Sequence, residues 1–336
     1  MTGSASSLPT VLASIVAALA TGGLAIWFAA PRRRWRARRV RGRVLLRALL
    51  PARVVRSRSG RLDIAAMLFS VTVAGSALGW ALLSSSWFAD GGSALLVALF
   101  GPRPATALPE WLTGTIAAAA LYLAYEFAYW IDHWLSHKVP VLWEFHKVHH
   151  SAESLSMLTN YRVHPVDTIL FYNIAAACTG LTAALLGFVL GRAVDPAALG
   201  LANLAIFAGS QTLSHLQHSH LWISLPGRWG KWLLSPAHHQ IHHSIAVRHY
   251  DRNFGSTTAL FDRMFGTLHM PTAAREPLTF GVTGLDYDPH GFRGAVLMPF
   301  VEAARRLMPP SPRRGNRRGP ASLAVRPGDG GFAQGA

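Results

Sequence analysis

Five apolar stretches restrict this chain to a small set of folds. A helix that crosses a bilayer needs about 20 consecutive, mostly apolar residues. The stretches that meet or approach this length are 9–30, 63–83, 111–131, 167–190 and 197–213. Backbone polar groups inside a bilayer must be paired within the protein, so each stretch is expected to form a helix. We therefore predict an all-α fold, an integral membrane helical bundle with about four or five spans.

The positive charge of the chain is gathered in two blocks. The formal net charge is +16; segment 32–61 alone contains thirteen arginines, and a second block begins at Arg305. Apolar stretches separate the blocks, which favours anchoring at an anionic membrane surface over binding to nucleic acid. We expect segment 32–61 to be cytoplasmic, because positive loops near spans stay inside. The Arg- and Ala-rich composition is typical of a bacterial protein, which indicates the inner membrane.

This orientation also predicts on which side of the membrane the two histidine-rich segments lie. Counting spans from the arginine block puts residues 133–164 and 215–249 on the cytoplasmic side. We expect these two segments to form a helical, histidine-rich cytoplasmic cap. The nearly uncharged segment 84–110 is expected to be an external loop, in which the apolar piece 93–100 is too short to span.

The same pattern divides the chain into four parts. Residues 1–62 are predicted to hold an N-terminal transmembrane helix and the Arg-rich cytoplasmic segment. Residues 63–272 are predicted to form the membrane domain, with its core at 111–267. A cytoplasmic extension is expected at 273–308. The segment 309–336 is rich in Pro, Arg and Gly, and we expect it to be a disordered basic tail.

Eight histidines in three tight clusters are the strongest candidates for a functional site. The clusters read HxxxH, HxxHH and HxxHH, and their members are His133, His137, His146, His149, His150, His239, His242 and His243. Residues three or four apart share one face of a helix, so each cluster can direct several imidazoles to one place. Imidazole binds iron, zinc, copper or nickel. Eight ligands are too many for one tetrahedral ion, so we predict a centre of two metal ions.

Further side chains near the clusters are weaker candidates. Additional metal ligands are expected among His164, His218 and His238. Residues that orient the imidazole rings are expected among Asp132, Asp167 and His220, with Glu126 and Asp262 as further carboxylates. For the carboxylates, roles as interfacial polar residues or helix caps stay open. No catalytic side chain beyond the metal centre is predicted.

The three motifs on an apolar helical scaffold resemble the sterol desaturase / fatty acid hydroxylase superfamily of membrane di-iron enzymes. The resemblance extends to the flanking residues and covers roughly 111–267. It includes Tyr129-Trp130, the sequence at 139–143, Ser151, His164-Pro165, Pro236-Ala237, the Asn-Phe-Gly at 253–255 and the Asp-Arg-Met-Phe-Gly-Thr at 262–267. Two positions depart from the family pattern, Trp134 and His220. These two departures bear on substrate or redox-partner contacts rather than on the metal ligands.

The resemblance implies two iron ions that use O₂ to hydroxylate, or to desaturate, an alkyl C–H bond of a lipid from the bilayer. Cleaving such a bond is beyond any side chain, so a redox metal must carry the step. Electrons must come from a separate ferredoxin- or cytochrome-type donor with its reductase. The chain itself has one cysteine, Cys178, no CxxCH, and no GxGxxG after a strand.

Two other classes of function remain as alternatives. A membrane zinc metallohydrolase is expected to carry HExxH, which is absent. A non-catalytic metal-binding protein or transporter is expected to place polar residues along its spans, whereas here they gather at one interface. Within the oxygenase interpretation, sterols, hopanoids, carotenoids, fatty acyl chains and ether lipids all suit an apolar pocket.

Overall fold

The computed structural model describes residues 50–70, 79–209, 215–225 and 227–308, together with the single residues 16, 20 and 72. Within these ranges the chain is helical and forms no strand, and two isolated β-bridges pair Leu233 with Thr258 and Ser244 with Phe280. The predicted all-α fold is therefore confirmed for the described chain. The predicted first span at 9–30 and the predicted tail at 309–336 lie outside the described residues.

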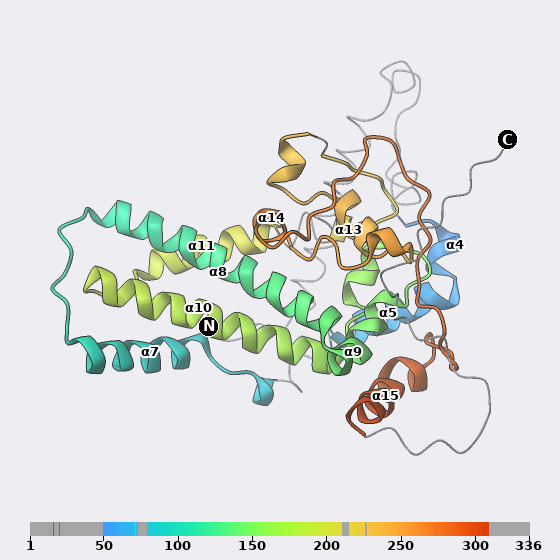
Figure 1. Ribbon diagram of the computed structural model, residues 1–336, viewed down its shortest axis with the longest axis horizontal. Helices are drawn as coiled ribbons and strands as arrows, with labels where there is room; N and C mark the ends of the chain where they lie inside the picture. Colours follow the sequence, from blue (N-terminus) through green and yellow to red (C-terminus); the bar gives the residue numbers. More distant parts are fainter. Residues whose placement is uncertain are drawn as a thin grey trace, which may run out of the picture.

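Four helices, α7 (Ser85–Phe100), α8 (Glu110–Lys138), α10 (Pro165–Leu190) and α11 (Pro196–Gly209), form one end of the molecule (Figure 1). Helix α10 packs against both α7 and α8, and α11 packs along α8. The buried residues between α8 and α11 are alanines, Ala117, Ala118 and Ala198, which let the two backbones approach closely, and Leu186 and Val194 pack against them.

The ends of α10 follow from its sequence. His164 is the N-cap, its Nδ1 accepts a hydrogen bond from the backbone N–H of Val166, and Pro165 occupies the first helical position. Gly191 ends the helix in the left-handed conformation, with φ of 64°. At 1.5 Å per residue, its 26 residues extend about 39 Å, longer than the hydrocarbon core of a bilayer.

Helix α10 is the one described helix that is long and apolar enough to cross a membrane by length and composition. Helix α8 is longer but more polar, and α11 is apolar but short. The predicted fifth span at 197–213 runs beyond α11 into residues outside the described part. The predicted second span at 63–83 begins within α5 (Arg58–Phe69) and then also enters residues that are not described.

The segment expected to be an external loop contains a helix instead. Helix α7 has 16 residues, begins after Ser84 and includes Gly91 and Gly92. Two glycines cost a helix about 2 kcal/mol, and packing against α10 offsets that cost. Gly92 permits the close approach of α7 to α10, because a Cβ at this position would lie only 2.9 Å from the Ala184 side chain.

The other end of the molecule is built from shorter helices, which we call the short-helix region (residues 50–70, 140–161 and 215–308). Its α-helices are α4 (Ala52–Val55), α5, α9 (Pro140–His150), α12 (His215–Gln217), α13 (Pro236–His242), α14 (Leu260–Met264) and α15 (Met298–Leu307). Its 3-10 and π turns are η3 (Met157–Tyr161), η5 (Trp229–Lys231), η6 (Val247–His249) and η7 (Arg293–Leu297), whereas η2 (Gly79–Ala81) precedes α7. Helix α15 packs on α9.

A buried ion pair ties α5 to η3 in this region. Arg162 Nε donates to Asp63 Oδ1 at 2.7 Å, and both side chains are fully buried. The second carboxylate oxygen of Asp63 accepts from Thr159 Oγ1 at 2.7 Å, and Arg162 Nη2 donates to Ser59 Oγ at 2.9 Å. Every charged group of the pair is thus hydrogen-bonded, as a buried pair requires.

We expect Asp63→Ala to lower the free energy of unfolding by about 3–5 kcal/mol, because it leaves the Arg162 charge buried without its partner. The matched control is Asp288→Ala, which removes the partner of Arg58 in an exposed pair and should cost about 1 kcal/mol or less. Unfolding of the purified protein in detergent, followed by denaturant titration, measures both. Equal costs for the two variants would contradict the assigned role of the buried pair.

Candidate metal centre

Three helices bring the eight motif histidines to one place. Helix α8 continues to Lys138, so His133 and His137 lie one turn apart at its end. Val139 is extended, as expected before a proline, and serves as both the C-cap of α8 and the N-cap of α9. This sharp turn directs the histidines of α9 back toward α8. Helix α13, which begins at Pro236, supplies the third cluster.

The histidines separate into two adjoining groups. Group one contains His133, His137, His146, His150 and His242, and group two contains His149, His218, His239 and His243. Within each group the ligand nitrogens all lie within 4.8 Å of one another. All eight motif histidines belong to a group, and His218 joins them. Consecutive histidines on a helix point about 100° apart, which is why His149 and His150 serve different groups.

Hydrogen bonds at Nδ1 fix the orientation of several rings. His133 Nδ1 donates to the Phe254 carbonyl at 2.8 Å, His242 Nδ1 to the Arg252 carbonyl at 2.8 Å, and His149 Nδ1 to the Arg162 carbonyl at 3.2 Å. A carbonyl oxygen only accepts, so each of these Nδ1 atoms carries the ring proton. The Nε2 atoms of the same rings therefore have free lone pairs.

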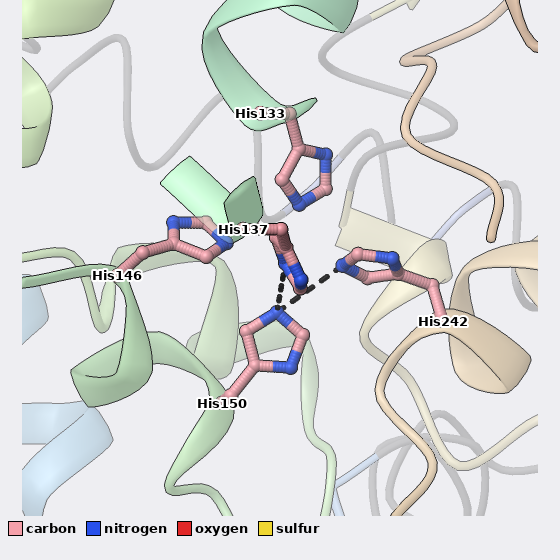
Figure 2. Close-up of side chains that lie close together, drawn as sticks. All are labelled: His133, His137, His146, His150 and His242. Carbon is pink, nitrogen blue, oxygen red and sulfur yellow. Dashed lines mark hydrogen bonds between the residues drawn. The ribbon is translucent and has the colours of Figure 1, made fainter. Parts of the chain in front are cut away.

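These Nε2 lone pairs face other Nε2 atoms at very short range. In group one, His150 Nε2 lies 3.1 Å from the Nε2 atoms of both His137 and His242 (Figure 2). In group two, His218 Nε2 lies 3.0 Å from His149 Nε2 and 2.9 Å from His239 Nε2. One ring N–H can be donated along only one of two such contacts. The remaining contacts place nitrogen lone pairs against each other.

A metal ion in each group resolves this arrangement. With metal–nitrogen bonds of about 2.1 Å, two ligands at right angles lie about 3.0 Å apart, close to the separations observed. The buried Nε2 atoms of His133 and His146 have no hydrogen-bond partner, although both rings belong to group one. Both groups therefore fit metal ions.

Burial keeps these imidazoles in the form that binds metal. It lowers the pKa of His149 and His239 well below the usual range for histidine, and the neighbouring His218 adds to the effect. The pKa of His242 is lowered to about 3, again mainly by burial. The rings are thus neutral at physiological pH, as a metal ligand must be.

The weaker candidates are distributed differently. His164 and His238 lie outside both groups. Each caps a helix instead: His164 begins α10, and His238 Nδ1 accepts from the backbone N–H of Ser235 at the start of α13. His220 also lies outside the groups. The signal for His164 was present in the sequence, since it directly precedes Pro165 at a helix start.

Of the candidate carboxylates, Asp167 contacts a motif histidine directly. Its Oδ2 lies 2.9 Å from His146 Nδ1, and its Oδ1 accepts from Ser136 Oγ. Within the described chain, no hydrogen bond joins Asp132 to either group. Glu126 accepts from the backbone N–H groups of Thr257 and Thr258, so it binds a loop rather than an imidazole.

Asp262 acts on the centre through the backbone, a role that the sequence did not indicate. Its two carboxylate oxygens accept from the N–H groups of Phe254 and Gly255, each at 2.9 Å. The carbonyls of Arg252 and Phe254 in this same loop hold His242 and His133. Asp262 thereby fixes the loop that orients two members of group one. The sequence named Asp262 as a candidate carboxylate near the imidazoles, but it could not indicate a role through backbone carbonyls, because these leave no trace in residue type.

In comparison with known proteins, residues 118–267 match a family model described as fatty acid hydroxylase. The chain is 26% identical over 179 residues to an alkylglycerol monooxygenase of Xenopus tropicalis, covering 52% of this chain and 32% of that protein. It is 26% identical over 197 residues to the ornithine lipid hydroxylase OlsE of Rhizobium tropici, and the match covers 59% of this chain and 54% of that protein.

A cholesterol 25-hydroxylase-like protein of Danio rerio is 30% identical over 166 residues, covering 45% of this chain and 55% of that protein. The chain therefore spans about a third to a half of the length of these relatives. No solved structure matches it. The matched segment contains all eight motif histidines, and the resemblance found in the sequence is confirmed over this segment.

We expect His149→Ala and His242→Ala each to lower the metal content by about one ion per chain, because each variant removes a ligand from a different group. His269→Ala is the control, since His269 belongs to neither group. Elemental analysis of the purified proteins measures the outcome. Full metal content in either ligand variant would refute the grouping.

Asp262→Asn should weaken metal binding by about 10–100-fold, a typical cost of disturbing the groups that orient metal ligands. The amide can accept at only one of the two positions that the carboxylate fills. Asp251→Asn is the matched control, because Asp251 is half exposed and pairs only with Lys138 at the surface; asparagine also tolerates its φ of 59°. Competition against a metal chelator gives both affinities, and identical values would overturn this assignment.

Proposed function

We propose that this chain is a membrane-bound oxygenase, a proposal supported by the match of residues 118–267 to the family model described as fatty acid hydroxylase. In this proposal, two iron ions, O₂ and external electrons serve to hydroxylate an alkyl C–H bond of a lipid. The observation that carries the proposal is the pair of adjoining groups of imidazoles, nearly all of them buried, in which Nε2 atoms face each other. The printed names of the relatives, an alkylglycerol monooxygenase and an ornithine lipid hydroxylase, support a lipid substrate.

The nature of the ligands supports iron over zinc. Group one offers five imidazoles, one more than the four ligands of a structural zinc site. Nine histidines in all surround the centre, and imidazole is a good ligand for iron. Bound iron would supply the activation of O₂ that no side chain can provide. Group one would hold one ion and group two the other.

The surrounding side chains would exclude water from the reaction. The Phe254 ring lies 5.1 Å from the ring of His137 and 5.4 Å from that of His133, between centroids. Tyr129 packs edge-on against His133 and against Phe171 of α10, with centroids 5.7 Å apart in each case. An apolar, dry wall of this kind protects a reactive centre from side reactions with water.

The position of the centre suits a substrate drawn from a bilayer. The hydrogen bond between His146 and Asp167 joins group one to the first turn of α10, the apolar helix long enough to span. We propose that the centre lies at the membrane interface, on the cytoplasmic side of a bacterial inner membrane, as the arginine block at 32–61 indicates. A lipid would then enter sideways, with its head group near the water.

The electrons would come from a separate protein. The single cysteine, Cys178, cannot hold an iron–sulfur cluster, and the sequence has no CxxCH motif for haem. A ferredoxin- or cytochrome-type donor with its reductase is the proposed partner. The net charge of +16 favours an acidic donor through electrostatic steering.

The test combines metal analysis with turnover. Protein loaded with iron should contain close to two irons per chain, with the antiferromagnetic coupling of an oxidised pair in Mössbauer spectra. Incubation with bacterial lipids, a reductant and ¹⁸O₂ should give lipids carrying one ¹⁸O atom, seen by mass spectrometry. The variant His149→Ala should form no such product, and His269→Ala should form as much as the wild type.

Other outcomes would decide against the proposal. A single tightly held zinc, after iron loading, would shift the case to a hydrolase. Two irons with lipids that lose two hydrogens and gain no oxygen would replace hydroxylation by desaturation. Two irons with no change in any lipid would leave a metal-binding protein without oxygenase activity.

A further inference from the structure

A cavity of about 460 Å³ lies beside α9, separate from the two histidine groups. Val148 of α9 lines it, and Val148 is two positions from both His146 and His150. Two positions correspond to about 200° around a helix, so Val148 and those histidines face opposite sides of α9. None of the nine grouped histidines lines the cavity. The cavity is therefore a second site.

The cavity has the size and lining of a lipid-chain site. Its volume falls within the range of about 300–1,000 Å³ of ligand pockets. Leu62 and Ala66 of α5, Val148 of α9 and Val296 of η7 give it an apolar interior. Two further lining residues are exposed aromatics, Phe69 at 41% and Phe292 at 73%. An apolar cavity that continues into exposed phenylalanines suits a ligand that passes from a bilayer into the protein.

Positive charge is placed beside these apolar residues. Arg58 and Arg61 of α5 both line the cavity and are both exposed. Arg58 pairs with Asp288, and the buried Arg162, which also lines the cavity, pairs with Asp63. Arg61 has no ion-pair partner among the described residues. Its guanidinium is thus available to an anion, and phosphate is the anion that arginine recognises best.

A buried polar group also lines the cavity. The side chain of His290 is 6% exposed, and its Nδ1 has no hydrogen-bond partner. Its Nε2 lies 3.2 Å from Glu153 Oε1 without the geometry of a hydrogen bond. Buried polar atoms in proteins almost always have a hydrogen-bond partner. An unpaired polar atom that faces a cavity therefore indicates a ligand that supplies this partner.

We propose that this cavity binds an anionic phospholipid. One acyl chain occupies the space between α5, α9 and η7, the phosphate pairs with Arg61, and a polar oxygen of the lipid near the phosphate pairs with His290. The lipid is held at a site distinct from the histidine centre. Its binding requires no turnover, so the proposal stands apart from the oxygenase activity.

The experiment uses the full-length, metal-loaded protein in bilayer nanodiscs. The probe is phosphatidylglycerol with a photoactivatable diazirine on one acyl chain, diluted in phosphatidylcholine. After illumination and digestion, mass spectrometry should find labelled peptides from 62–69 and 292–296. The same diazirine on phosphatidylcholine should label these peptides several-fold less, because its head group has no net charge.

Two variants test the separate parts of the proposal. Arg61→Glu should lower labelling by phosphatidylglycerol about tenfold, because it reverses a charge at a lipid-binding surface. Arg56→Glu is the matched control, since Arg56 is exposed nearby but does not line the cavity, and it should label like the wild type. Ala66→Trp should reduce labelling by both lipids, because it fills the cavity.

Metal content and melting temperature serve as checks that each variant is folded. Equal labelling of Arg61→Glu and Arg56→Glu would overturn the assignment of the phosphate to Arg61. Equal labelling by the two lipids would remove the preference for an anionic head group. Labelling outside 62–69 and 292–296 would show that the cavity is not where the chain binds.

Discussion

The structure depends on nine imidazoles gathered at one place. Burial lowers the pKa of most of these rings, among them His149, His239 and His242, and so favours their neutral form. The carbonyls of Phe254, Arg252 and Arg162 fix which nitrogen keeps the proton in three of the rings. The result is a set of inward-facing lone pairs about 3 Å apart. Such an arrangement is unfavourable without cations and strongly favourable with them. The rest of the short-helix region serves to hold these rings in place.

That support comes from a polar framework around the histidines. Asp262 holds the loop at 252–255, Asp167 reaches His146 from α10, and the pair of Arg162 with Asp63 fixes the carbonyl that orients His149. Asp63 and Asp167 join segments that are distant in the chain, and Asp262 also accepts a hydrogen bond from Trp130 Nε1 of α8. The framework thus links the folding of the short-helix region to the geometry of the centre. Replacing one of these acids would weaken the packing of the region and also the orientation of the histidine rings.

The sequence predicted those features that depend on local spacing. The separations in HxxxH and HxxHH place imidazoles on one helix face, which is enough to predict convergence of the eight histidines. The sequence named His164, His218 and His238 alike as possible further ligands. It could not distinguish His218, which joins the groups, from His164 and His238, which cap helices, because these outcomes depend on tertiary contacts. Helix α7 was missed for a similar reason: packing of Gly92 against Ala184 offsets a poor local propensity.

The alternation of the histidines on α9 and α13 has a consequence for how the centre assembles. Each of these helices supplies rings to both groups, with His149 and His150 in different groups, as are His242 and His243. An ion that enters one group fixes the rotation of both helices, and so prepares the other group in advance. The second ion then meets a smaller entropic penalty than the first. In a chain with both groups intact, loading is therefore expected to be cooperative, with few such chains holding a single ion when metal is scarce.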